Sequence, residues 1–305
     1  MVTWNLRPCS APPASSMSNH RDVVEVFDGI RFPGFMHTTE SLKAACSFEF
    51  QDTDVLLVTF PKSGTTWMQQ VLSLIFCEGN LWPIRHLPNW IRAPRIEHIS
   101  FSSLLAQWDT TRPPLLTTHL CAKALAPALM KSKTRVVYMA RNPKDVLVSF
   151  YHFQRIANFL PDPSSFQDFM DEFLEGTVFY GSWFDHMKGW LSLQKNLNML
   201  LMTYEEMHQE PRGTIQKLSD FLQHPLGPEE KDLIMRHCSF SFMSGVVNYS
   251  LVSKEIMDQN RGKFLRKGVV GNWKEHFTPE HNEKFNAVYK AKIGDFGLRL
   301  PWTMD

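Results

Sequence analysis

The stretch Val55–Trp67, VLLVTFPKSGTTW, joins an apolar run to a glycine-centred loop and to the first residues of a helix. Val55–Phe60 has the length and the β-branched content of a buried strand. Apolar side chains then recur at helical spacing, at Trp67, Val71, Leu74 and Ile75. The stretch therefore predicts a strand, a tight loop and an amphipathic helix in succession.

The loop between that strand and that helix has the features of a phosphate-binding loop. Gly64 lets the backbone approach an anion, and Lys62 adds a positive charge. Hydroxyl groups and free N–H groups of the first helical turn come from Ser63, Thr65 and Thr66. The loop differs from the ATPase loop because the leading glycine is missing and the lysine precedes Gly64. The alternative is a capped helix start with a solvated lysine.

Three further apolar runs are each followed by polar residues and a helix-like segment, namely Leu115–Thr118, Arg135–Met139 and Asn198–Met202. This alternation is typical of a parallel sheet, in which ligands bind beyond the carboxyl ends of the strands. The residues that follow the four runs should therefore converge on one site. They are Lys62–Thr66, His119, Arg141 and Tyr204.

Arg141 opens the segment RNPKD, which leads into a helical pattern. A guanidinium at a strand end can clamp a phosphate with two hydrogen bonds, and Pro143 suits a first helical turn. Ser149 lies about two turns along that helix. Ser149 can reach the same ligand only if the helix points at the site. The alternative is that Ser149 is a buried structural serine that is hydrogen-bonded to the backbone.

Residues 259–274, QNRGKFLRKGVVGNWK, form a cationic, glycine-rich segment. Four cations within seven positions and three glycines between 262 and 271 indicate a loop that suits a second phosphate group of the same ligand. A solvated run of charges is the alternative.

His119 ends the run that begins at Leu115. A neutral imidazole at a strand end that faces an anion site can accept a hydroxyl proton near neutral pH. A structural histidine is the alternative reading.

The composition restricts where this anion site works. Among 305 residues, 32 Lys and Arg balance 31 Asp and Glu, so the net charge of +1 gives no general attraction to nucleic acid or membrane. Five widely spaced cysteines and the lack of a signal peptide or spanning segment predict a cytoplasmic protein. We expect residues 1–20, rich in Pro and Ser, to be a disordered leader, and 27–305 to be one domain.

From Phe27 to Trp302 the chain resembles the cytosolic sulfotransferases. Three motifs, TFPKSGTTW, ARNPKDVLVSFYHF and FLRKGVVGNWKEHFT, occur in that family's order and near its spacing. The resemblance implies an α/β fold, a single domain with a central parallel sheet flanked by helices, related to P-loop kinases. It also implies the co-substrate 3′-phosphoadenosine 5′-phosphosulfate (PAPS) and no metal.

The resemblance implies the following donor contacts. It assigns the 5′-phosphosulfate end to Lys62, Ser63, Gly64, Thr65, Thr66 and Trp67, and the 3′-phosphate to Arg141, Ser149, Arg266, Lys267 and Gly268. It assigns the adenine side to Trp67, Tyr204, Cys238, Ser239, Phe240, Ser241, Phe242 and Met243, and the rest of the wall to Phe264 and Leu265. His119 matches the catalytic base, and Lys62 would neutralise the leaving bridging oxygen.

Several positions depart from the family pattern. Thr117, Cys121 and Cys238 stand where lysine, proline and threonine are common in the family. Pro279 replaces a valine in the family's short dimer motif, which would weaken a homodimer built on main-chain pairing. Whether the chain dimerises stays open.

The acceptor end resembles the hydroxysteroid branch, in the segments FDGIRFP, RAPRIE and the Pro301–Trp302 ending. This predicts a lipophilic alcohol as acceptor, with a phenol or amine as the alternative, and a role in steroid or xenobiotic metabolism. Two other functions are weighed against it. One is an ATP-dependent small-molecule kinase, which the missing Walker loop disfavours, and the other is a silent protein that binds PAPS or its product.

Overall fold

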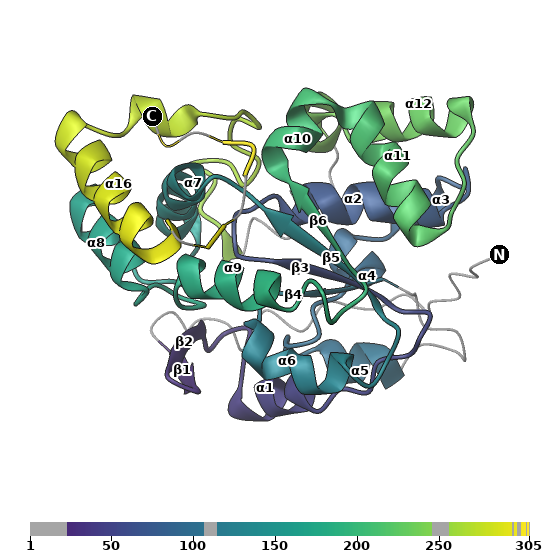
Figure 1. Cartoon of the computed structure of the whole chain (residues 1–305), viewed down its shortest axis with the longest axis horizontal. Coiled ribbons are helices and arrows are strands. Elements are labelled where there is room, and N and C mark those ends of the chain that lie inside the picture. The colour runs from purple at the N-terminus through teal and green to yellow at the C-terminus, as the bar shows by residue number, and fades with distance from the viewer. Residues whose placement is uncertain are drawn as a thin grey trace.

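The computed structural model describes residues 23–106, 115–245 and 256–294, together with 296–297, 300–302 and 304 near the C-terminus. The leader predicted over residues 1–20 lies outside this range. A four-stranded parallel sheet occupies the centre of the molecule, in the order β4-β3-β5-β6 (Figure 1). Its strands are β3 (Val55–Thr59), β4 (Leu115–Thr118), β5 (Arg135–Ala140) and β6 (Met199–Thr203). The four predicted runs and their parallel pairing are confirmed to within one residue at each end.

A two-stranded antiparallel hairpin precedes the sheet, and the sequence interpretation missed it. It consists of β1 (Val24–Phe27) and β2 (Ile30–Pro33). The connecting residues Asp28 and Gly29 have φ of 50° and 77°, the left-handed conformation that tight hairpin turns require. An Asp-Gly pair between two short β-rich runs was the available signal.

Helices cover both faces of the sheet (Figure 1). Alternate strand residues enter two separate clusters of buried side chains, with Leu56 and Val136 in one and Leu57 and Val137 in the other. The first cluster includes residues of α1 (Thr39–Cys46), α6 (Ala122–Leu129), α7 (Pro143–Ile156), α8 (Phe166–Glu175), α9 (Trp183–Ser192) and α16 (Pro279–Ile293). The second includes residues of α2 (Thr65–Phe76), α3 (Trp82–His86), α10 (Tyr204–Gln209), α11 (Pro211–Leu222) and α12 (Pro228–His237).

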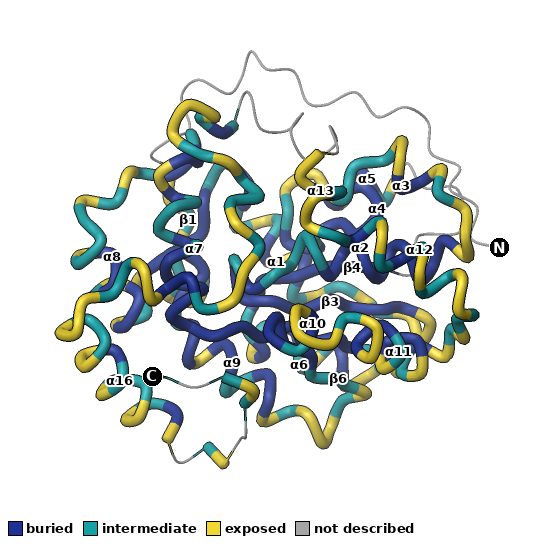
Figure 2. Tube along the Cα trace, turned by 90° about the horizontal axis from the view of Figure 1, so that it is seen from above, coloured by how far each residue is buried: buried dark blue, intermediate teal, exposed yellow. Residues whose placement is uncertain are grey.

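Shorter helices complete the described chain. These are α4 (Asn89–Arg92), α5 (Phe101–Ala106), α13 (Phe240–Gly245) and the 3₁₀ helix η2 (Asn272–Glu275). In Figure 2 the buried trace follows the strands and the inner helices, and the exposed trace follows the rim. The sheet is therefore shielded on both faces, and its carboxyl edge is where polar side chains can meet a ligand.

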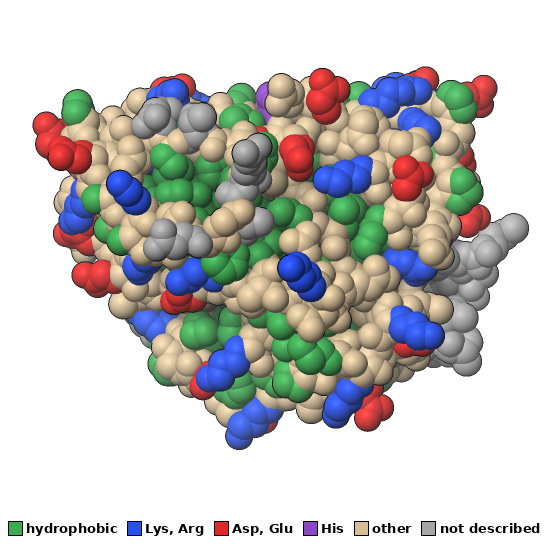
Figure 3. All heavy atoms as spheres, in the orientation of Figure 1, with side chains coloured by type: hydrophobic (Ala, Val, Ile, Leu, Met, Phe, Trp, Pro, Cys, Tyr) green, Lys and Arg blue, Asp and Glu red, His purple; other side chains and the backbone are tan. Residues whose placement is uncertain are grey.

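The face of the molecule shown in Figure 3 has no single dominant charge, in keeping with the balanced composition. Figure 3 shows Lys, Arg, Asp and Glu side chains interspersed around the rim of one face, with apolar side chains nearer its middle. No helix among the described residues is long and apolar enough to cross a membrane.

Pro279 is the first residue of α16, and the Thr278 side chain caps that helix. The first N–H groups of a helix have no partner within the helix, so a proline is tolerated there. Dimerisation through this segment stays a prediction.

Candidate active site

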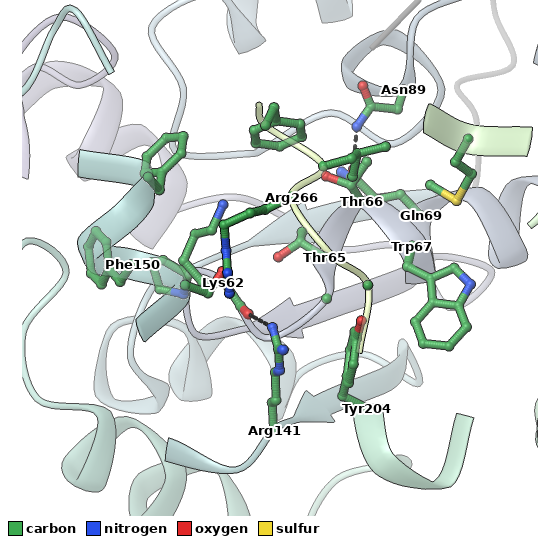
Figure 4. Close-up of a pocket in the computed structure, with 18 of the residues that line it drawn as sticks. Lys62, Thr65, Thr66, Trp67, Gln69, Asn89, Arg141, Phe150, Tyr204 and Arg266 are labelled. Carbon is green, nitrogen blue, oxygen red and sulfur yellow. Dashed lines mark hydrogen bonds between the residues drawn. The ribbon is translucent and has the colours of Figure 1, made fainter. Parts of the chain in front are cut away.

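A cavity of about 520 Å³ lies at the carboxyl edge of the sheet. Most of the residues predicted to bind the donor or to act in catalysis line it, as Figure 4 shows for several of them. They are Lys62, Gly64, Thr65, Thr66, Trp67, His119, Arg141, Ser149, Tyr204, Cys238, Ser239, Phe240, Met243, Phe264, Leu265, Arg266, Lys267 and Gly268. Ser63, Ser241 and Phe242 are not in the cavity wall.

Lys62 stands at the start of the phosphate loop in the left-handed conformation, with φ of 70°. Its Nζ lies 4.2 Å from the centroid of the Phe153 ring and 4.8 Å from that of Phe264. Burial, followed by the charges of Arg141 and Arg266, lowers the pKa of Lys62 to about 7. No described carboxylate forms a salt bridge with the Lys62 ammonium, so an anion in the cavity would stabilise its charged form.

The rest of the loop turns directly into α2. Gly64 precedes the helix with φ of 101°, and a Cβ on it would come within 2.8 Å of the Tyr204 ring. Only glycine fits this turn without displacing that ring. Ser63 is fully buried, and its hydroxyl has no hydrogen-bond partner within the described chain. The Thr65 hydroxyl lies 2.7 Å from the Thr59 hydroxyl, which ties the loop to the end of β3.

Arg141 reaches the loop from the end of β5 (Figure 4). Its two terminal nitrogens donate to the carbonyl oxygens of Lys62 at 3.1 Å and Val269 at 3.2 Å, and its guanidinium lies 4.1 Å from the Tyr204 ring centroid. Burial and the charge of Arg141 lower the pKa of Arg266. No salt bridge joins Arg141 or Arg266 to a carboxylate of the described residues. Together with Lys62 they form a cationic cluster that has no salt bridge within the described part of the chain, which fits a multiply charged anion.

Asp145 anchors the glycine-rich segment against this cluster. Its two carboxylate oxygens accept the backbone N–H groups of Gly271 at 2.7 Å and Trp273 at 2.9 Å. Gly268 has φ of 67°, and a Cβ on it would lie 2.2 Å from the Phe240 ring. Lys267 also pairs with Glu275 at 2.5 Å on the surface. Residues 264–269 therefore form part of the cavity wall, whereas Arg261, Lys263 and Lys267 are exposed, so the predicted ligand loop and the solvated run of charges each describe part of the segment.

The side of the cavity predicted to hold adenine is aromatic and thiol-lined. The rings of Trp67 and Tyr204 meet edge to face, with centroids 5.1 Å apart. Cys238 is buried, and burial raises the pKa of its thiol to about 11. Phe242 packs instead on the His237 ring, with centroids 4.7 Å apart, and Ser241 is exposed. Only part of the predicted 238–243 segment therefore faces the cavity.

His119 lies at the end of β4 and is 8% exposed. Its Nδ1 is 2.8 Å from the Thr59 carbonyl oxygen and 3.0 Å from the Thr59 hydroxyl. Burial, followed by the charge of Arg95, lowers the pKa of His119 to about 3. The imidazole is therefore neutral at physiological pH, and because a carbonyl only accepts, its proton is on Nδ1 and Nε2 is free to accept one.

Glu97 forms a hydrogen bond with His119, and the sequence analysis predicted no role for it. Its carboxylate accepts the backbone N–H of His119 at 2.9 Å, deep in the protein. Two other residues near the base, Tyr180 and Arg95, also line the cavity. The Tyr180 ring meets the His119 ring edge to face at 5.4 Å. Tertiary pairing brings these residues together, so neither spacing nor periodicity could have identified them.

The cavity wall also has a large apolar part. It includes Pro33, Met36, Trp90, Phe159, Leu160, Phe179, Ile256 and Met257. This part suits a lipophilic molecule, whereas the cationic part suits anions.

The sequence matches the model of the sulfotransferase domain over residues 52–297. The chain is 41% identical to Sulfotransferase 2B1 of Mus musculus, over 90% of this chain and 82% of the relative. It is 39% identical to Sulfotransferase 2A1 of Homo sapiens, over 90% and 97% of the two chains. It is also similar to the crystal structure of a mouse sulfotransferase, SULT7A1, complexed with PAP, with a TM-score of 0.73, 29% identity and coverage of 89% and 95%.

The chain therefore belongs to the sulfotransferase family, and the predicted family and fold class are confirmed. The similarity to Sulfotransferases 2B1 and 2A1 agrees with the predicted branch. Among the described residues, no group of three or more His, Cys, Asp and Glu side chains could hold a metal ion.

Proposed function

We propose that this sulfotransferase moves the sulfuryl group of PAPS to the hydroxyl or amine of a small lipophilic acceptor. The observation that carries the proposal is that one cavity holds both a neutral histidine and a cationic cluster with no salt bridge to any described carboxylate. The PAP bound to the related mouse structure supports an adenosine bisphosphate as the occupant of the anionic end.

The cavity can be divided between the two substrates on this proposal. Lys62, Arg141 and Arg266 would bind the phosphate groups, because these cavity cations act on one another and form no salt bridge with a described carboxylate. Trp67 and Tyr204 offer rings to the adenine. Lys267, Gly268 and Ser149 line the same end of the cavity and would complete the 3′-phosphate site. The apolar part of the cavity wall would then bind the acceptor.

The reaction we propose needs one base and one cation at the leaving group. The acceptor oxygen or nitrogen attacks sulfur, its proton passes to Nε2 of His119, and the bond from sulfur to the bridging oxygen breaks. The electron pair remains on the leaving adenosine bisphosphate, where protonated Lys62 would stabilise the bridging oxygen. General base catalysis of this kind contributes roughly 10²–10⁴ in rate. Fixed cations would perform the charge neutralisation that a magnesium ion performs in kinases.

The acceptor we favour is a bulky alcohol of the hydroxysteroid type, and a phenol or amine is the alternative. The apolar part of the cavity wall supports a lipophilic molecule. We also propose a cytoplasmic location, on the cysteine pattern of the sequence.

The test is transfer of radiolabelled sulfonate from PAPS to a panel of steroids, phenols and amines in EDTA, with wild type and His119→Ala. Labelled product that disappears in the variant would establish the reaction and the acceptor class. If no acceptor is labelled while PAP still raises the melting temperature, the protein is a silent binder of the nucleotide. Transfer that requires added magnesium would contradict the proposed role of the fixed cations.

A further inference from the structure

Arg95 is a cation in the wall of the cavity that is not among the residues predicted to bind the donor. Its backbone runs beside the edge strand β4, where Arg95 forms a parallel bridge with Thr117. The Ile96 N–H donates to the Thr117 carbonyl at 3.0 Å, and the Thr117 N–H donates to the Pro94 carbonyl at 2.8 Å. Arg95 is thus held in a fixed register two residues before the level of His119.

The Arg95 guanidinium has only weak partners among the described residues. One terminal nitrogen is 3.5 Å from the Tyr180 hydroxyl, and the other is 3.3 Å from the Met36 sulfur, a poor acceptor. No described carboxylate forms a salt bridge with Arg95. The nearby Glu97 carboxylate accepts the backbone N–H of His119, and the charge of Arg95 acts on its pKa without forming a salt bridge. Among the described residues, the two hydrogen-bond partners of the Arg95 guanidinium are thus a hydroxyl and a thioether, and neither carries a charge.

Arg95 is half-buried, and an anionic ligand would give its charge a strong partner inside the cavity. Arg95 shares the cavity wall with apolar residues such as Met36, Phe159 and Tyr180. Removing a charged group from water is unfavourable unless it is paired and hydrogen-bonded. The position is close to the reacting centre, because the Tyr180 ring contacts His119 while its hydroxyl meets Arg95.

We propose that Arg95 selects acceptors that carry a carboxylate in addition to the reacting hydroxyl, that is, lipophilic hydroxy acids. This inference rests on the proposed sulfotransferase function and specifies its acceptor. A planar guanidinium recognises a carboxylate through two parallel hydrogen bonds, which gives both affinity and orientation. The carboxylate would anchor the acceptor next to Tyr180 while its hydroxyl points toward Nε2 of His119.

The test compares acids with their primary amides, which have nearly the same shape but no charge. Two acids with different distances between the hydroxyl and the carboxylate are used. One is a hydroxyaryl acetic acid, and the other is a hydroxysteroid with a carboxylate on its side chain. In wild type we expect kcat/KM for the acid to exceed that for the amide roughly 10- to 100-fold at one spacing or both. In Arg95→Met the ratio should fall to near one, and Arg95→Lys should keep part of it.

Direct binding separates this proposal from the proposed function. Calorimetry measures the affinity of the preferred acid for wild type and Arg95→Met, each with PAP present and with matching melting temperatures. Tenfold weaker acid binding in the variant supports the role of Arg95 even if no transfer is detected. Transfer to acids and amides at equal rates, or an acid preference that survives in Arg95→Met, overturns it and leaves the sulfotransferase function intact. If the variant slows both acceptors equally, Arg95 acts on the donor or on the fold, and the proposal is wrong.

Discussion

The Nδ1 of His119 lies 2.8 Å from the carbonyl oxygen of Thr59, the last residue of β3. Because the carbonyl only accepts, this contact fixes which ring nitrogen carries the proton and leaves Nε2 as the base. Thr59 also immediately precedes the phosphate loop, so one strand end orients both the base and the donor site. The two halves of the proposed reaction are therefore coupled through the backbone of β3.

His119→Ala should lower kcat/KM by roughly 10²–10⁴ while the Kd for PAP changes less than threefold. The pKa of His119 is lowered to about 3, so the free enzyme holds this base neutral at any pH above about 4. The acid limb of the wild-type kcat/KM profile should consequently show no ionisation near 6.5. An ionisation near pH 6.5 in the wild-type profile would contradict the low pKa of His119 if it disappears when His119 is replaced by another base.

Donor binding should be linked to proton uptake by Lys62. Its pKa in the free protein is lowered to about 7, and a bound anion favours the charged form, so PAP binding must add a proton above that pH. Between pH 7.5 and 9, where the phosphates of PAP are already ionised, Kd should rise up to tenfold per pH unit. Calorimetry in buffers of different ionisation enthalpy should report uptake that approaches one proton.

Lys62→Met should abolish that pH dependence and weaken PAP binding roughly 10- to 100-fold. The same change should raise the melting temperature of the free protein near pH 7, because it removes a cation whose charged form burial disfavours. Lys195, an exposed lysine, provides the control, since Lys195→Met should leave both quantities unchanged. A pH dependence that persists in Lys62→Met would assign the proton to another group.

The sequence allowed the sheet and most of the site to be predicted because both depend on local order along the chain. Each strand is an apolar run, and each predicted residue at the carboxyl edge directly follows one of them. Ser63, Ser241 and Phe242 lie outside the cavity wall because helix rotation and side-chain direction, which spacing does not give, decide which member of a segment faces inward. Glu97 and Arg95 join the site through pairing with β4, a contact that no local pattern encodes.

Stability and kcat should require the hydrogen-bond acceptor of Glu97 but not its negative charge. Glu97→Ala leaves the buried N–H of His119 without its partner, which should lower stability by about 1–3 kcal/mol and also lower kcat. Glu97→Gln keeps an acceptor oxygen in the same place. Denaturant unfolding and steady-state kinetics of the two variants distinguish these roles.

The pH dependence of the two proteins gives a second check on Glu97. Burial raises the pKa of its carboxyl, so the folded protein holds this proton more tightly than the unfolded chain. Stability is therefore lost as pH rises from about 4.5 through the folded pKa. The free energy of unfolding of Glu97→Gln, measured relative to wild type, should increase from pH 5 to pH 8. No change with pH would mean that the carboxylate stays ionised and is stabilised by a partner such as Arg95.

Alanine substitutions at Gly268 and Gly271 provide a matched comparison that tests the wall of the donor site. Both have positive φ, of 67° and 78°, so an alanine at either position adds backbone strain of roughly 1 kcal/mol. A Cβ at Gly271 meets no atom within 4 Å, whereas one at Gly268 would lie 2.2 Å from the Phe240 ring. Gly268→Ala should therefore displace Phe240 from the cavity wall and raise the Kd for PAP about tenfold more than Gly271→Ala, with similar losses of melting temperature.

A double-mutant cycle with Phe240→Ala tests that cause. If the steric conflict with the ring is what weakens binding, Gly268→Ala should cost far less affinity in the Phe240→Ala background than in wild type, because the clash is gone and only the backbone strain remains. If the two changes are additive in the free energy of PAP binding, the loss at Gly268 arises from the loop itself, through its positive φ or its approach to the phosphate. Because Phe240 is 40% exposed, its own truncation should leave the stability of the protein nearly unchanged, which keeps the cycle interpretable.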